Sequence, residues 1–283
     1  MLVTGAAGFI GARVKALLAE RGADVIAVDH AWNSQEELTD LVGGQPLGAC
    51  IHLGWYANPR DYLTAEEPNL RSLADSTALV ERLAAIGCGH LVVAGSCAEY
   101  ADASEPLREG SPIGPWSAYG TSKVALREML ERSWRANGLG LTWARLFNLT
   151  GPGESAARLV PTVTRALLAG TPVDLSPGQQ VRDYLDVDDV ASALVQLADC
   201  RYDGVVNVCS GEPVSLRRLL GALADRIGRA DLLRFGAREY AEHDAMILVG
   251  DNSRLRETGW IRSYPFSEMT DRVVAHWKEQ SSR

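Results

Sequence analysis

The chain opens with Met1-Leu-Val-Thr-Gly-Ala-Ala-Gly-Phe-Ile-Gly11, an apolar start that leads directly into three glycines spaced three residues apart. The start predicts a short strand, and the residues from about Phe9 to Arg21 predict a helix that Gly22 ends. Residues 24–28 predict the next strand, which Asp29 follows directly. Strand, glycine-rich turn, helix, strand and acid, in that order, are typical of a dinucleotide-binding unit.

Each glycine of this turn has its own role in such a unit. Gly5 allows the tight turn, Gly8 lets the backbone approach a pyrophosphate at the helix N-terminus, and Gly11 lets the helix and strand pack closely. Asp29 stands 18 residues after Gly11, near the spacing of about 20 at which an acid binds a ribose hydroxyl. The alternative is a tight turn in another kind of α/β protein, but the flanking elements and the acid favour a cofactor site.

A second stretch, Ser117 to about Asn137, predicts one helix that carries Tyr119 and Lys123. Ser117 can cap its start and Gly138 can close it. Residues four apart share a helix face, so the phenol and the ammonium group are expected to lie together. The ammonium group favours the phenolate and lowers the tyrosine pKa from its ordinary value of about 10, which makes the hydroxyl a usable general acid or base. The alternative is an accidental surface pair.

Composition excludes several classes of protein. The 283 residues are 46% hydrophobic and 23% charged, which fits one large globular domain or a domain with a smaller lobe. A net charge of −8, without a basic stripe, argues against a nucleic-acid surface. No apolar run is as long as a membrane span and no signal peptide precedes the first strand, so a cytoplasmic protein is expected. The five cysteines are scattered without metal-ligand spacing, which predicts reduced thiols and no metal site.

The glycine spacing and the tyrosine–lysine pair resemble the extended branch of the short-chain dehydrogenase/reductase superfamily, and the resemblance covers essentially the whole chain. It implies an α/β fold with a doubly wound, mostly parallel Rossmann sheet and a smaller C-terminal lobe that binds the substrate. We expect residues 1–150 and 181–210 to form the dinucleotide-binding domain. Residues 151–180 and 211–283 are expected to form the substrate-binding lobe.

The stretch Gly95-Ser-Cys-Ala-Glu-Tyr100 follows an apolar run typical of a strand buried on both faces. The family has a catalytic serine or threonine four residues before an aromatic residue, and Ser96 and Tyr100 have that spacing. The resemblance implies that Ser96 holds a substrate oxygen with which Tyr119 exchanges a proton. It also implies that Lys123 lowers the pKa of Tyr119 and holds the cofactor ribose. The alternative for Ser96 is an ordinary strand-end serine.

The residues after Ser96 narrow the reaction. Sugar-nucleotide 4,6-dehydratases have Asp-Glu directly after the hydroxyl residue, because they eliminate water. Here the residues are Cys97 and Ala98, which cannot do that chemistry. Glu99 either contacts the substrate or caps the turn.

The resemblance assigns the cofactor contacts to the glycine-rich turn, two strand ends and the tyrosine–lysine helix: Gly5, Ala7, Gly8, Phe9, Ile10, Asp29, Leu53, Gly54, Tyr119 and Lys123. Ile51-His-Leu-Gly54-Trp55 resembles the family's His-Leu-Ala-Ala, whose backbone lines the cofactor. His52 is interpreted as a packed strand-end residue rather than a catalyst, because no acid stands at a recognisable spacing. Residues 30–48 depart from the family: they predict one helix, about Ser34 to Val42, and lack the usual strand with an acid that contacts adenine.

The substrate contacts that the resemblance implies are Ser96, Cys97, Asn148 and Arg182. Asn148 belongs to Arg145-Leu-Phe-Asn148, similar to the family's Arg-x-Phe-Asn segment. Arg182 begins a segment that matches the family's Arg-Asp-Phe/Tyr-x-x-Val-x-Asp-x-Ala. Because a guanidinium group binds phosphate in a fork, Arg182 is the predicted diphosphate clamp. The alternative is a surface ion pair with Asp183 or Asp186. Asp188 is predicted to cap a helix over residues 189–197.

The C-terminal segment, with Phe235-Gly-Ala and Gly259-Trp260, resembles reductases of nucleotide-linked 4-keto-6-deoxyhexoses, among them CDP-abequose synthase. The resemblance implies reduction of the C4 ketone.

NAD(H) is the favoured cofactor, because the Asp29 carboxylate repels a 2′-phosphate, and NADP(H) is the alternative. Two other functions stay open. One is a nucleotide-sugar epimerase with tightly bound NAD. The other is a non-catalytic NAD(P)-sensing protein, although such relatives usually lose the tyrosine–lysine pair.

Two partners are expected. One is a nucleotide-diphosphate sugar, whose base, sugar and product stereochemistry the sequence leaves open. The other is a second copy of the chain, because helices equivalent to residues 69–86 and 117–137 form the dimer face in this family.

Overall fold

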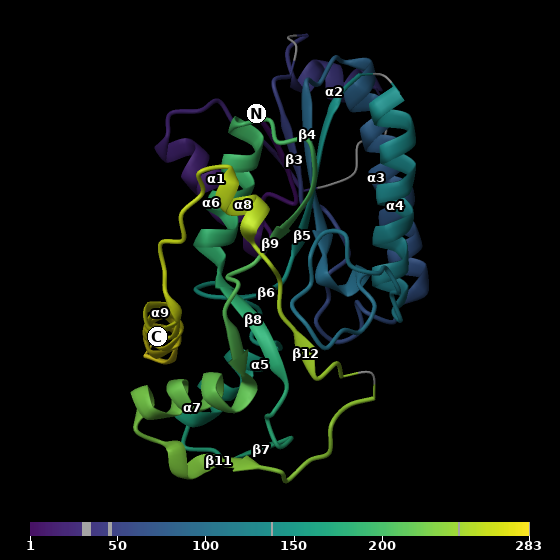
Figure 1. The fold of residues 1–283 in the computed structure, drawn as a ribbon. Helices are drawn as coiled ribbons and strands as arrows, with labels where there is room; N and C mark the ends of the chain where they lie inside the picture. Colours follow the sequence, from purple (N-terminus) through teal and green to yellow (C-terminus); the bar gives the residue numbers. More distant parts are fainter. Residues whose placement is uncertain (30–34, 45–46, 137, 243, 283) are drawn as a thin grey trace.

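The computed structural model describes residues 1–29, 35–44, 47–136, 138–242 and 244–282. Its centre is a six-stranded sheet in the order β2-β1-β3-β4-β5-β9, with every neighbouring pair parallel (Figure 1). The strands are β1 (Leu2–Thr4), β2 (Ile26–Val28), β3 (Cys50–His52), β4 (His90–Ser96), β5 (Gly140–Leu146) and β9 (Gly204–Val208). The predicted α/β class with a mostly parallel sheet is confirmed.

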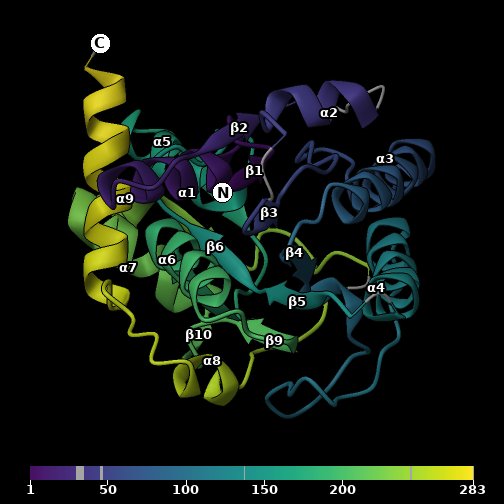
Figure 2. The same cartoon turned by 90° about the horizontal axis from the view of Figure 1, so that it is seen from above.

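Helices cover both faces of this sheet (Figure 2). Alternate strand residues point to opposite faces. Val3 and Val92 therefore pack in one buried cluster, with α1 (Phe9–Glu20) and α6 (Val187–Asp199). Neighbouring residues of the same strands pack in a second cluster with α3 (Glu66–Ala85), α4 (Ala118–Ala136) and α2 (Gln35–Leu41). Burial on both faces explains why the strands are apolar without alternation.

The glycine-rich turn after β1 has the geometry that its sequence predicts. Gly5 has φ of +64°, and a Cβ there would lie 2.9 Å from the Gly54 nitrogen. A Cβ on Gly11 would lie 2.0 Å from the Gly5 oxygen. The turn therefore packs against both its own helix and the end of β3.

A smaller unit lies beyond the carboxyl ends of the central strands. In it β8 pairs with β10, β12 and β6, and β11 pairs with β7. Its helices α5, α7 and α9 share one buried cluster. The elements are β6 (Asn148–Thr150), α5 (Leu159–Leu168), β7 (Val173–Leu175), β8 (Val181–Asp186), β10 (Pro213–Ser215), α7 (Leu216–Ile227), β11 (Leu233–Phe235), β12 (Ile247–Leu248) and α9 (Phe266–Ser281). Short turns of helix add η1 (Cys97–Glu99), η2 (Ala230–Leu232) and α8 (Ser253–Glu257).

The structure departs from the sequence predictions in two details. Residues 148–150 and 181–186, expected in the dinucleotide-binding domain, form β6 and β8 in the smaller sheet. The predicted helix cap at Asp188 is wrong, because α6 begins at Val187 and the Asp186 carboxylate accepts from the Asp188 nitrogen at 2.9 Å. Asp188 lies inside the first turn and pairs with Arg13 and Arg272.

The segment after Asp29 is described only in part. Helix α2 lies within the predicted helix, and β2 is an edge strand of the central sheet over the described residues. The family's additional strand would fall partly on residues 30–34 and 45–46, which lie outside the described residues. Within the described ranges, no helix is long and apolar enough to cross a membrane.

Candidate active site

The three predicted catalytic residues come together at the carboxyl end of β4. Ser96 is the last residue of that strand, and Tyr119 and Lys123 lie in the first turns of α4. The Ser96 side chain lies close enough to the Tyr119 phenol to favour the phenolate and lower the pKa, against a larger effect of burial. The Lys123 Nζ lies 5.7 Å from the centre of the Tyr119 ring. Two hydroxyls and an ammonium group therefore share one site, which suits proton transfer to or from a carbonyl oxygen.

The expected lowering of the Tyr119 pKa is wrong for this structure. Burial has the largest effect on the phenol and raises its pKa well above the ordinary value, and Tyr62 raises it further. The ammonium group of Lys123 instead donates to the Ala94 oxygen at 2.9 Å. Sequence spacing shows that the two side chains share a helix face, but it does not show how deeply the phenol is buried.

Lys123 is itself almost fully buried, at 3% exposed. Burial lowers its pKa to about 7, against an opposing effect of Glu99. Its Nζ lies 3.7 Å from the centroid of the Trp55 ring. The lysine therefore changes charge near neutral pH and has an aromatic neighbour that the sequence analysis missed.

The segment between β3 and α3 supplies an aromatic wall around Tyr119. The rings of Trp55 and Tyr62 meet the Tyr119 ring edge to face, with centroid distances of 6.3 and 5.1 Å. The Tyr119 nitrogen also donates to the Leu63 oxygen at 3.2 Å. One sequence feature could have predicted this aromatic wall. Trp55 stands where the family motif has a small alanine.

Glu99 caps the turn rather than facing a substrate. Its side chain is 0% exposed and accepts from the Ser96 nitrogen at 2.7 Å. It also accepts from Trp143 Nε1 at 2.9 Å and from Arg145 Nε at 2.8 Å. This buried, fully bonded carboxylate fixes the backbone that carries Ser96.

The cofactor-binding residues predicted in the glycine-rich turn surround the N-terminus of α1. The Asp29 carboxylate accepts from the Ala7 nitrogen at 2.6 Å. Gly8 is the N-cap, and over the described residues no side chain caps this end and no acid lies in its first turn. Phe9 and Ile10 begin the helix. A helix N-terminus of this kind fits the pyrophosphate of a dinucleotide.

The end of β3 is fastened to the same turn. The nitrogens of Leu53 and Gly54 each donate to Thr4 Oγ1 at 3.2 Å. The His52 imidazole bonds to Thr4 Oγ1 at 2.7 Å and to Ser76 Oγ at 2.9 Å. Burial lowers the pKa of His52 to about 3, so the ring is neutral. This is the packed strand-end residue that the sequence predicts.

The predicted substrate contacts other than Ser96 lie on the smaller sheet and on η1. Asn148 on β6 is paired in register with Tyr184 on β8, and its Nδ2 is buried without a hydrogen-bond partner among the described residues. Cys97 is half-buried, and burial raises the pKa of its thiol to about 12. Asn148 therefore has a donor to offer a ligand, whereas Cys97 is an unreactive thiol.

Arg182 has a partner that the sequence analysis did not weigh. It forms an ion pair with Asp244 and donates from Nη1 to the Val181 oxygen at 3.0 Å. The two aspartates expected as alternatives are engaged elsewhere. Asp183 accepts from Ser210, Gly211 and Gly250, and Asp186 pairs with Arg272. The alternative of a surface ion pair with Asp183 or Asp186 is therefore wrong.

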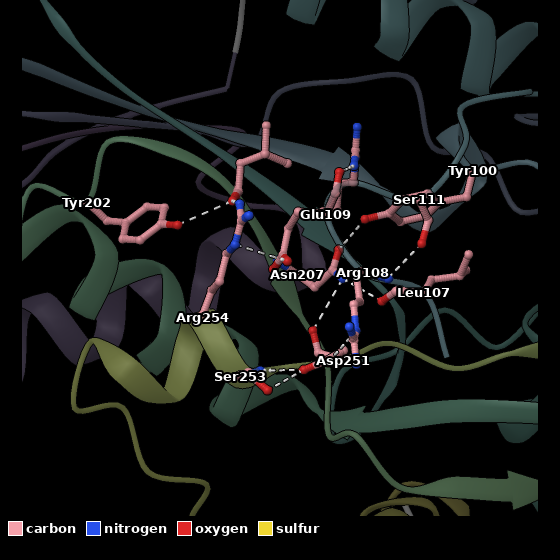
Figure 3. Close-up of polar contacts among 12 residues, drawn as sticks. Tyr100, Leu107, Arg108, Glu109, Ser111, Tyr202, Asn207, Asp251, Ser253 and Arg254 are labelled. Carbon is pink, nitrogen blue, oxygen red and sulfur yellow. Dashed lines mark hydrogen bonds and ion pairs between the residues drawn. The ribbon is translucent and has the colours of Figure 1, made fainter. Parts of the chain in front are cut away.

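A polar network fastens the loop after η1 to β9 and α8 (Figure 3). Glu109 accepts from the Asn207 nitrogen at 2.9 Å and pairs with Arg254 at 3.3 Å. Arg108 pairs with Asp251 at 3.2 Å. Two adjoining pockets of about 630 and 750 Å³ follow this network, and neither is lined by a predicted site residue. The network reaches the site through Arg145, whose Nη1 donates to the Glu109 oxygen at 3.1 Å.

Comparison with known proteins places this geometry in a family. The model described as "NAD dependent epimerase/dehydratase family" matches residues 1–209. GDP-6-deoxy-D-mannose reductase of Pseudomonas aeruginosa is 29% identical, over 99% of this chain and 97% of that protein. UDP-glucose 4-epimerase of Azospirillum brasilense is 25% identical, over 98% of this chain and 91% of that protein. The structure of Thermus thermophilus UDP-glucose 4-epimerase with NAD superposes with a TM-score of 0.86 at 24% identity, covering 98% of both chains, which shows a shared fold.

Proposed function

The chain belongs to the NAD dependent epimerase/dehydratase family of enzymes, and we propose that it reduces the C4 ketone of a nucleotide-linked 4-keto-6-deoxyhexose with NAD(P)H. The observation that carries this proposal is the placement of Ser96 and Tyr119 together beside Lys123 at the carboxyl end of β4. The reductase relative supports it, because that protein's name describes a 6-deoxyhexose reductase.

The cofactor supplies hydride when it is bound, and NAD(H) is favoured over NADP(H). The N–H groups at the start of α1 suit its pyrophosphate. Asp29 suits the adenosine ribose, and the backbone at Leu53 and Gly54 suits the nicotinamide half. Lys123 would hold the nicotinamide ribose. These residues supply binding and orientation.

The proton chemistry falls to Tyr119 and Ser96. Tyr119 gives its proton to the ketone oxygen as hydride arrives at carbon. Ser96 donates a hydrogen bond to the same oxygen and stabilises the charge that develops there. The closely packed aromatic wall excludes water from this step.

Asn148 and Arg182 are the proposed substrate contacts outside the reacting centre, with Cys97 lining the sugar pocket. The unpaired Nδ2 of Asn148 can donate to a sugar oxygen. Arg182 has five N–H donors, and its described contacts use two of them. The remaining donors suit a diphosphate while Asp244 holds the guanidinium group in place.

The second candidate is a nucleotide-sugar epimerase with tightly held NAD. It uses the same three residues, and the epimerase relative favours it. A non-catalytic NAD(P)-sensing protein is disfavoured, because this chain keeps Tyr119 and Lys123 together in the site.

We expect the purified protein to consume NADH or NADPH when it is given a nucleotide-linked 4-keto-6-deoxyhexose. The assay follows the loss of reduced-nicotinamide absorbance over a panel of CDP-, dTDP-, GDP- and UDP-linked ketosugars. UDP-glucose without added cofactor is the control for epimerisation. Retention of NAD through gel filtration, with conversion of UDP-glucose and no net use of cofactor, would establish the epimerase instead.

We also expect a homodimer that joins α3 and α4 of one copy to those of the other. Leu70 on α3 is 60% exposed and Met129 on α4 is 44% exposed, and burial of such side chains drives association. Analytical ultracentrifugation should give twice the 30.5 kDa chain mass. Leu70→Asp should shift the equilibrium toward monomer. A wild-type monomer at every concentration would contradict this assembly.

A further inference from the structure

Two groups hold the Lys123 ammonium group in place. One is the Ala94 oxygen at 2.9 Å, and the other is the face of the Trp55 ring, whose centroid lies 3.7 Å from Nζ. A cation at this distance is attracted by the negative face of an indole ring. We propose that Trp55 is a positioning residue of this site, whose indole face fixes the Lys123 ammonium group next to Tyr119. Trp55 stands where the family motif that this stretch resembles has alanine.

The Trp55 ring is itself held by α3. Its Nε1–H donates to Asn69 Oδ1 at 2.8 Å. Asn69 is 0% exposed, and its Nδ2 donates to the oxygens of Tyr62 and Ala65 at 2.7 and 2.8 Å. One buried amide therefore fixes both the indole ring and the backbone next to Tyr62. The ring is a rigid platform for the lysine rather than a mobile surface side chain.

The other titratable groups near Lys123 are neutral or bonded elsewhere, so the indole matters for the charge of the lysine. Glu99, from η1, favours the charged lysine but is bonded to Arg145. His52, from β3, is neutral, because burial and Lys123 lower its pKa. Tyr119, on the same helix, is a neutral phenol. Burial lowers the pKa of Lys123 to about 7, so an added attraction from the indole changes the fraction of charged lysine at neutral pH.

The chain has three lysines, Lys15, Lys123 and Lys278, so the contact can be observed directly. Protein labelled with ¹³C and ¹⁵N in lysine gives three sets of side-chain resonances, which Lys15→Arg and Lys278→Arg assign by elimination. We expect the Lys123 Hε protons to be shifted upfield by the indole ring current. A pH titration of the same resonances gives the pKa of Lys123. Neither measurement needs a cofactor or a substrate.

Trp55→Phe and Trp55→Leu form the matched pair. Both remove the Nε1–H bond to Asn69, but only phenylalanine keeps an aromatic face. We expect Trp55→Leu to abolish the upfield shift and to lower the titration midpoint of Lys123 by about one pH unit. Trp55→Phe should keep most of the upfield shift and a titration midpoint close to that of the wild type. Circular dichroism establishes that each variant is folded over the titrated range.

Two results would overturn the proposal. An unchanged Lys123 midpoint in Trp55→Leu would show that the indole face does not hold the charge. Equal midpoints in the two variants would assign the effect to the lost Asn69 bond.

The role of the contact rests on the proposed function of Lys123, so NADH affinity is measured as well. We expect Trp55→Leu to weaken NADH binding several-fold more than Trp55→Phe does. Failure of ketosugar reduction itself would appear in the wild-type substrate panel, which these variants do not enter.

Discussion

Replacing Tyr119 with phenylalanine is expected to lower turnover about 100-fold or more and to leave cofactor binding intact. The ring keeps its edge-to-face contacts with Trp55 and Tyr62, so the wall of the site stays in place. The change removes only the phenolic hydroxyl beside Ser96, and with it the proton. Loss of a positioned general acid typically costs about 10²–10⁴ in rate.

Tyr62 offers the matched control, because its ring packs against Tyr119 with centroids 5.1 Å apart. Tyr62→Phe removes a neighbouring phenolic hydroxyl without touching the proposed proton donor, so most of the turnover should remain. The measurement is kcat at saturating cofactor and ketosugar, with NADH affinity determined by calorimetry. Wild-type turnover in Tyr119→Phe would remove Tyr119 from the mechanism.

The meeting of Ser96, Tyr119 and Lys123 was predictable because the signals behind it are local. An apolar strand that ends on Ser96 and a helix that follows Ser117 both place side chains at the carboxyl edge of a parallel sheet, where such folds bind ligands. The glycine-rich turn could also be predicted from one short stretch of sequence. A Cβ on Gly11 would collide with the Gly5 oxygen at 2.0 Å, so the packing requires glycine in the sequence itself.

The missed features depend on contacts between distant segments. Asp244 reaches Arg182 from 62 residues away, and Arg145 reaches Glu99 from 46 residues away. Local periodicity does not encode either pair. The pKa of Tyr119 was missed for a related reason, because burial is a property of the packed fold. Desolvation by the wall around the phenol outweighs the charge that sequence spacing places nearby.

Charge at Asp29 is expected to make the enzyme prefer NADH to NADPH by about 100-fold in kcat/KM. The carboxylate directly follows β2 and accepts from the Ala7 nitrogen at 2.6 Å, beside the turn that suits the cofactor. A 2′-phosphate would bring about two negative charges against it, and like-charge contact of this kind costs several kcal/mol. About 2.7 kcal/mol corresponds to 100-fold.

Asp29→Asn tests this charge, because the amide oxygen can still accept from Ala7 while the negative charge is lost. We expect the preference to narrow or invert, mainly through KM, because the ribose is remote from the transferred hydride and its contact contributes uniform binding. Asp24→Asn, an exposed acid ahead of the same strand, should leave the preference unchanged. The measurement is kcat/KM for both reduced cofactors on all three proteins. A wild-type preference for NADPH would contradict the placement of Asp29 and would assign the phosphate contact to the segment that follows it.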